Sequence, residues 1–116
     1  MRVLLANEPR AYREALGAAL RALRPNDRIR VVEPARLAEA LERCSPHLVV
    51  CSDLTLLVGP RLLAWAVLYP NGASHAELCL NGRRILTTTE VQLEDLLTLA
   101  DRTAALIRDD QRRIAG

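Results

Sequence analysis

The residues best suited to chemistry follow two apolar runs. Asn7 and Glu8 come directly after the run at 2–6, and Ser52 and Asp53 end a second run, HLVVCSD. If both runs are parallel strands, these four side chains meet at one edge of a sheet, where open α/β sheets bind ligands. Carboxylate oxygens at such an edge suit Mg²⁺. The alternative interpretation is structural: Asn7 or Glu8 caps a helix, and Ser52 and Asp53 belong to a turn.

Two His–Cys pairs share a four-residue spacing, His47 with Cys51 and His75 with Cys79. A zinc site made from all four would require two strands to bring the pairs together. The alternative is that they are ordinary core and edge residues. With Cys44 the cysteine count is odd, and no CxxC motif occurs. We therefore expect reduced thiols in a cytoplasmic protein, since no secretory signal or membrane-spanning run is evident.

The charge composition limits the possible reactions and partners. All sixteen basic residues are arginine, so no lysine is present to form a Schiff base or clamp a phosphate. The net charge of +2 is too small to favour nucleic acid. Arg83–Arg84 and Arg112–Arg113 could contact phosphates, but no aromatic residues alternate with them. Direct nucleic-acid binding is therefore not expected, and the arginines are interpreted as a solvated turn and tail.

The first half of the chain alternates strand and helix patterns. Apolar runs predict strands, and an apolar stripe with helical spacing predicts each helix. The inner stripe of the first helix is Tyr12, Leu16, Ala19, Leu20 and Leu23, and that of the second is Leu37, Ala40, Leu41 and Cys44. The strand after the first helix alternates and is expected at the sheet edge. This order is typical of an α/β domain with a parallel sheet. The expected elements are a strand at 2–6, a helix from about Pro9 to Leu23, a strand at 28–33, a helix from Pro34 to about Arg43, and a strand at 47–53.

The second half has a different pattern. Residues 54–61 are too few for a crossover helix and predict one turn or an irregular loop, followed by a strand at 62–68. Asn81-Gly82 lies between two β-prone runs, which is a strong signal for a two-residue hairpin. Such a loop places Leu78 opposite Ile85 and Glu77 opposite Leu86. The hairpin is expected to extend or cover the sheet.

A long amphipathic helix is expected to end the domain. Thr89 and Gln92 fit a capping box, and the helix is predicted to run to about Arg108. We expect the domain to comprise 1–108, followed by a frayed polar tail at 109–116. The apolar stripe is wide enough to cover the sheet and also to meet a second subunit. The predicted interface residues are Leu93, Leu96, Leu97, Leu99, Leu106 and Ile107.

Two segments resemble the receiver domains of two-component response regulators. They are VLLANEPRAYREALGAAL at 3–20 and SPHLVVCSDL at 45–54, so the resemblance covers about Arg2 to Leu54. The resemblance implies a flavodoxin-like, three-layer sandwich. It also implies a bacterial role in signal transduction or transcription regulation, and pairing of subunits through the last helix.

The chain departs from the receiver pattern at the residues that carry phosphotransfer. The family has two carboxylates after the first strand, where this chain has Asn7-Glu8. The position of the phosphorylated aspartate falls on Ser52, with Asp53 one residue later. Tyr69 ends the fourth strand where the family has a hydroxyl residue, and the family's lysine is missing. We therefore expect a non-catalytic pseudo-receiver without a cofactor, which acts through a protein partner, chiefly as a homodimer. The alternative is a phosphorylatable receiver with Asp53 as acceptor and Glu8 and Asp53 as Mg²⁺ ligands.

Overall fold

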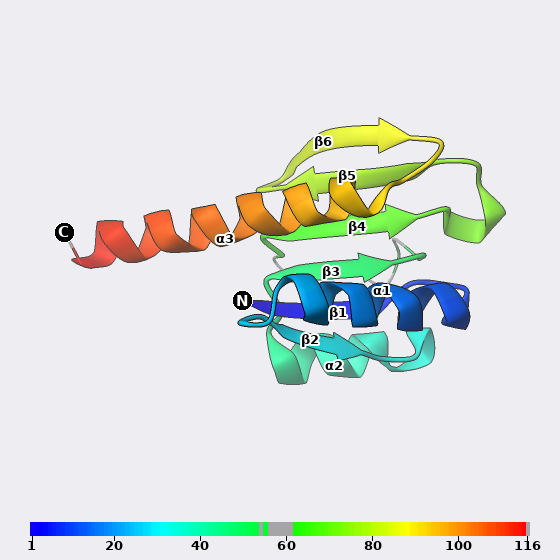
Figure 1. The fold of residues 1–116 in the computed structure, drawn as a ribbon, viewed down its shortest axis with the longest axis horizontal. Coiled ribbons are helices and arrows are strands. Elements are labelled where there is room, and N and C mark those ends of the chain that lie inside the picture. The colour runs from blue at the N-terminus through cyan, green and yellow to red at the C-terminus, as the bar shows by residue number, and fades with distance from the viewer. Residues whose placement is uncertain (54, 56–61, 116) are drawn as a thin grey trace.

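The computed structural model describes residues 1–53, 55 and 62–115, and it contains an α/β fold with a six-stranded mixed sheet (Figure 1). The strand order is β2-β1-β3-β4-β5-β6. The α/β class expected from the sequence is confirmed. The expectation for 54–61 lies outside the described residues except for Thr55. The elements are β1 (Arg2–Ala6), α1 (Arg10–Leu23), β2 (Arg28–Val31), η1 (Pro34–Arg36), α2 (Leu37–Cys44), β3 (Leu48–Cys51), β4 (Ala64–Leu68), η3 (Pro70–Gly72), β5 (Ala76–Leu80), β6 (Arg83–Thr88) and α3 (Leu93–Ala115).

Four strands of the sheet are parallel. Strand β1 pairs with β2 on one side and β3 on the other, and β3 pairs with β4. Strand β2 lies at the sheet edge, as its alternating pattern predicts. Because the strands are parallel, the residues that follow β1 and β3 lie at the same edge of the sheet. This arrangement brings the predicted site residues into one region.

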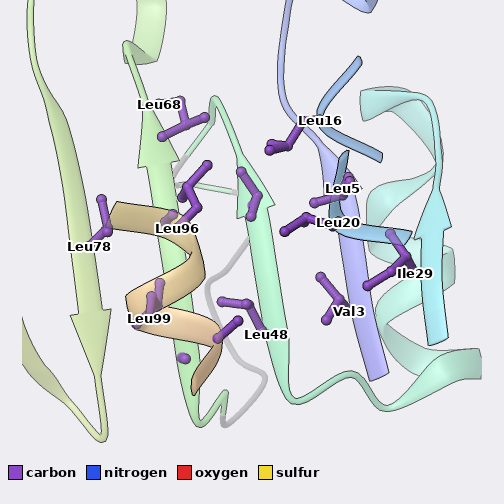
Figure 2. Close-up of a cluster of buried hydrophobic side chains, with 14 of the residues drawn as sticks. Val3, Leu5, Leu16, Leu20, Ile29, Leu48, Leu68, Leu78, Leu96 and Leu99 are labelled. Carbon is purple, nitrogen blue, oxygen red and sulfur yellow. The ribbon is translucent and has the colours of Figure 1, made fainter. Parts of the chain in front are cut away.

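Helices α1 and α3 cover one face of the sheet (Figure 2). Leu16 and Leu20 of α1 pack over β1 and β3, and Leu96 and Leu99 of α3 belong to the same buried cluster. The strands contribute alternate residues to this cluster, as a period of two requires. Strand residues in it include Val3, Leu5, Ile29, Leu48, Val50, Ala66, Leu68, Leu78 and Leu80.

Helix α2 packs against the opposite face. Leu37, Ala40 and Leu41 bury against the other set of alternate strand residues, including Leu4 and Val49. These are the helix residues that the apolar spacing predicts as the inner stripe. The parallel part of the sheet therefore carries α1 on one face and α2 on the other.

Helix α1 differs from its prediction at both ends. Neither Asn7 nor Glu8 caps it: the N-cap is Pro9, which makes no side-chain capping bond. Asn7 is instead fully buried. At the other end, Leu23 is 55% exposed, although its spacing placed it on the inner face. Arg13 is buried in the helix, where its guanidinium donates to the Asn7 carbonyl oxygen at 3.1 Å.

The hairpin extends the sheet with two antiparallel strands. Asn81 and Gly82 both have positive φ, 52° and 81°, as a two-residue turn of this kind requires. The predicted register is wrong beyond Cys79, because a bulge leaves Ile85 without an opposing residue. Leu78 therefore lies opposite Leu86, and Glu77 opposite Thr87.

Helix α3 begins and ends later than predicted. The expected capping box at Thr89 and Gln92 is wrong, because the Gln92 N–H donates to Asp95 Oδ2 at 2.8 Å, and the helix starts at Leu93. The expected frayed tail is also wrong: residues 109–115 continue the helix. Basic residues in the last turn interact favourably with the helix dipole. The C-terminal part of α3 projects beyond the sheet (Figure 1).

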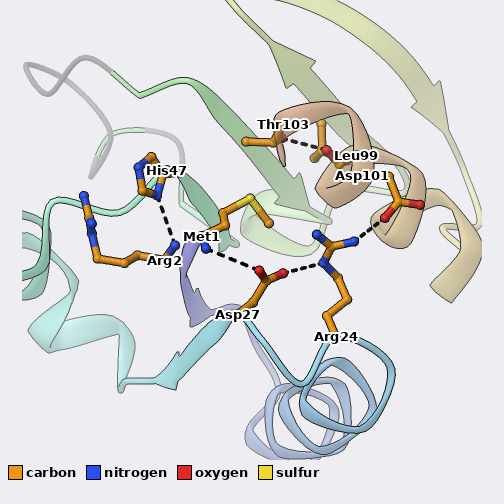
Figure 3. A network of polar contacts seen from close by, with 8 residues as sticks. All are labelled: Met1, Arg2, Arg24, Asp27, His47, Leu99, Asp101 and Thr103. Atoms are coloured by element: carbon orange, nitrogen blue, oxygen red, sulfur yellow. Dashed lines mark hydrogen bonds and ion pairs between the residues drawn. The ribbon is translucent and has the colours of Figure 1, made fainter. Parts of the chain in front are cut away.

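A polar network joins α3 to the start of the sheet (Figure 3). Arg24, which follows α1, forms ion pairs with both Asp27 and Asp101. Asp27 also accepts from the N-terminal ammonium of Met1 at 3.3 Å. The network links residues far apart in sequence and fixes the N-terminal half of α3 over the sheet. No helix among the described residues is long and apolar enough to cross a membrane.

Candidate functional site

An open cleft of about 670 Å³ lies beyond the carboxyl ends of β1 and β3. Three of the predicted residues, Glu8, Ser52 and Asp53, line it together. Its volume lies within the range of small-molecule sites. The described lining residues carry two carboxylates and no cationic side chain. They are Ala6, Glu8, Pro9, Tyr12, Pro34, Ser52, Asp53, Tyr69, Asn71 and Gly72.

Glu8 and Ser52 are joined directly. The Glu8 backbone N–H donates to Ser52 Oγ at 2.9 Å. This bond ties the chain after β1 to the chain after β3, as parallel pairing of the two strands predicts. Because the Ser52 hydroxyl is engaged with backbone, its role in the structure is to fix the cleft wall.

Asp53 is held in a local turn. Its Oδ1 accepts from the Thr55 N–H at 3.0 Å and from Thr55 Oγ1 at 2.6 Å. The described residues contain no group of three or more His, Cys, Asp or Glu that could hold a metal ion. The alternative Mg²⁺ site therefore depends on Glu8 and Asp53 alone. That site stays a prediction.

Two tyrosines complete the cleft, and sequence reasoning gave neither of them a role there. Tyr69 adopts a left-handed conformation with φ 51°, and its hydroxyl accepts from the Val91 N–H at 2.9 Å. Burial, with a smaller contribution from Tyr69, raises the pKa of Tyr12. Tyr69 is thus fixed between the cleft and the segment that precedes α3.

Asn7 and Arg13 lie beneath the cleft region as buried polar residues. Asn7 stands between the lining residues Ala6 and Glu8, and neither polar atom of its side chain has a partner within the described part of the protein. Arg13 is not among the residues that line the cleft. Its guanidinium instead contacts the Asn7 backbone. Arg13 is therefore engaged with backbone and does not line the cleft with the two carboxylates.

The His–Cys pairs do not come together. Cys51 lies on β3 and Cys79 on β5, with β4 between them. Burial raises the pKa of Cys51 to about 11, which leaves it a neutral thiol. His47 accepts the Arg2 N–H at Nδ1 at 3.0 Å, and burial lowers its pKa (Figure 3). All three cysteines are free thiols.

The predicted interface residues of α3 fall into two groups. Leu96 and Leu99 are in the core, 2% and 0% exposed, so neither can contact a partner, and their assignment to an interface is wrong. Leu93 is exposed, and Leu97, Leu106 and Ile107 are half-buried. Of these, Leu106 and Ile107 lie in the second half of α3, together with the half-buried Ala104 and Ala105.

The arginine pairs predicted as solvated residues are exposed, and Arg84 pairs with Glu77 at 3.2 Å. A second group of arginines was not predicted from the sequence. Four arginines far apart in the chain line a second cavity at the opposite edge of the sheet. No sequence motif links them, because parallel strand pairing is what brings them together.

Comparisons with protein-family models, with curated proteins and with solved structures found no match to this chain.

Proposed function

We propose that this chain is a non-catalytic pseudo-receiver, a cytoplasmic module of bacterial signal transduction or transcription regulation that acts through protein contacts. Its flavodoxin-like character is supported by four parallel strands in the order β2-β1-β3-β4, with α1 and α2 on opposite faces. Glu8 and Asp53 line one cleft, where the receiver resemblance expects its acidic residues. The family's second metal carboxylate and its lysine are missing from the sequence.

The proposal that the protein acts through protein contacts rests chiefly on the second half of α3. The helix has 23 residues and is therefore roughly 34 Å long at 1.5 Å per residue. Its first half is anchored by Leu96, Leu99 and Ala100, which are almost fully buried. The C-terminal part of α3 projects past the sheet (Figure 1). The second half of the helix also contains two half-buried apolar residues, Leu106, which packs against the core, and Ile107.

The partner that fits best is a second copy of the chain. The projecting end carries both arginines and aspartates, so an identical helix meets charges of both signs. Arg112 and Asp109 are already within 4.0 Å of each other along the helix. A two-fold pairing would bury the apolar residues of both copies and place the charged residues at the rim. A contact of standard size buries roughly 800 Å² per subunit.

Light scattering coupled to size exclusion tests this proposal. We expect a dimer whose population rises with concentration, and conversion to a monomer in Ile107→Glu. Thr98→Glu is the matched control, since it adds the same charge to an exposed position of the same helix. Urea unfolding confirms that both variants fold. A wild-type monomer at all concentrations, or equal loss of dimer in both variants, would contradict pairing through this surface.

A second candidate is a receiver still phosphorylated at Asp53. It is favoured by one observation, namely that Glu8 and Asp53 line the same cleft. It requires another group to replace the missing lysine. Phosphorylation of wild-type protein that is lost in Asp53→Asn would support it over the leading proposal.

A further inference from the structure

Four arginines converge on one cavity of about 510 Å³. Arg2 begins β1, Arg28 and Arg30 lie on β2, and Arg43 is in the last turn of α2. The register pairs Arg2 with Arg28 and Leu4 with Arg30, so these side chains alternate onto the sheet face that α2 covers. The cavity therefore lies where α2 ends over the edge of the sheet.

The charges in this cavity are not balanced within it. Its described lining contains four guanidinium groups and no carboxylate. Among the described residues, the one ion pair of these arginines joins Arg43 to Glu39 at 3.1 Å, and both side chains are exposed, so the pair is weak. Like charges gathered in a concave surface raise the local potential and attract an anion.

Part of the arrangement has a structural explanation. Arg2 Nε donates to the Ser45 carbonyl oxygen at 2.9 Å, which satisfies the end of α2. Arg30 Nη1 lies 2.9 Å from Cys44 Sγ. Each contact uses one of the five N–H donors of a guanidinium and orients the rest. Helix capping does not account for Arg28, whose guanidinium has no partner among the described residues.

We propose that this cavity binds a small molecule with at least two phosphate groups. A guanidinium presents two parallel N–H donors that match phosphate oxygens, and several such groups can share one polyphosphate. Leu4, Cys44 and Pro46 add an apolar wall, which suits the non-phosphate part of the ligand. A nucleoside diphosphate has both features and the appropriate size for a cavity of this volume.

A small ligand fits the observations better than a nucleic acid. The four arginines are exposed but line one concave surface, whereas Arg83 and Arg84 lie on the far edge strand. The net charge of the whole chain is only +2. This proposal is independent of pairing through α3, since none of its residues lies on that helix.

Calorimetric titration of the full chain at low ionic strength with pyrophosphate, ADP and adenosine tests the proposal. We expect pyrophosphate to bind, ADP to bind more tightly because of its nucleoside, and adenosine to bind weakly or not at all. The double variant Arg28→Gln/Arg30→Gln should lose about tenfold or more in affinity for ADP. The control Arg83→Gln/Arg102→Gln has the same net charge and should keep its affinity within about twofold, since its contribution is only long-range and screened.

Cysteine alkylation provides a second readout. Cys44 lines the cavity, so bound ADP should slow its reaction with iodoacetamide, as measured by peptide mass mapping. Thermal melts of both double variants establish that they fold. Failure of pyrophosphate and ADP to bind the wild type, or equal losses in both double variants, would overturn the proposal. The proposal would also be overturned if the wild-type protein bound single-stranded DNA but did not bind ADP.

Discussion

Gly17 lies at a close approach between α1 and strand β2. A Cβ added at this position would lie 2.7 Å from Val31 Cγ2, closer than real Cβ atoms come to any neighbour. The side chain of Val31 is β-branched and has few rotamers available to move away. The close packing of α1 against β2 therefore requires a residue without a side chain at this point of the helix.

Gly17→Ala sets two effects against each other. Alanine favours the helix over glycine by about 1 kcal/mol. Overpacking a buried contact costs roughly 1–3 kcal/mol. Because Val31 cannot yield easily, we expect the substitution to lower the free energy of unfolding by about 1 kcal/mol in the wild-type background. In the Val31→Ala background the obstructing methyl group is absent, so Gly17→Ala should stabilise by up to about 1 kcal/mol.

Urea unfolding of the four proteins in this cycle measures the coupling between the two positions. The expected result is a reversal of sign for Gly17→Ala between the two backgrounds. Stabilisation by Gly17→Ala in the wild type, or the same effect in both backgrounds, would refute the packing of α1 on β2 described above.

Three further predictions follow from burial and protonation. Leu99→Ala should lower the free energy of unfolding by roughly 2–5 kcal/mol, against about 0.5 kcal/mol for the exposed Leu93→Ala, as measured by urea denaturation. The pKa of His47 is lowered by burial and by Arg2, so stability should fall as pH drops below the unfolded pKa of about 6.5, and this fall should shrink in His47→Gln. Urea unfolding curves at pH values from 7.5 to 5.5, on the order of one unit either side of that pKa, measure this change in the free energy of unfolding. Half-buried Cys44 should be alkylated by iodoacetamide well before Cys51, because a pKa of about 11 keeps Cys51 protonated. Peptide mass mapping measures the order of alkylation, and faster alkylation of Cys51 would contradict the prediction.

Local patterns in the sequence were sufficient for most elements of the fold. The run at 2–6, the stripe of Leu37, Ala40 and Leu41, and the Asn81-Gly82 turn are confirmed because each depends on neighbouring residues. The start of α3 was predicted wrongly because two capping patterns overlap. The Gln92 N–H donates to Asp95 Oδ2, so the helix is capped at Gln92, three residues after the predicted cap at Thr89.

Long-range contacts explain what the sequence did not reveal. The bulge at Ile85 changes the hairpin register through a backbone irregularity with no sequence signature. Glu8 and Asp53 could be predicted to share a sheet edge, because parallel pairing follows from alternating strands and helices. The cavity formed by Arg2, Arg28 and Arg43 could not, since it depends on the register between β1 and β2 and on where α2 ends.

The proposal that the cleft has lost phosphotransfer is tested most directly by intact mass measurement. The full chain is incubated with acetyl phosphate and Mg²⁺, alongside Asp53→Asn and the exposed control Asp110→Asn. The account predicts an unchanged mass for all three proteins. A gain of one phosphoryl group in the wild type and in Asp110→Asn, absent from Asp53→Asn, would contradict it.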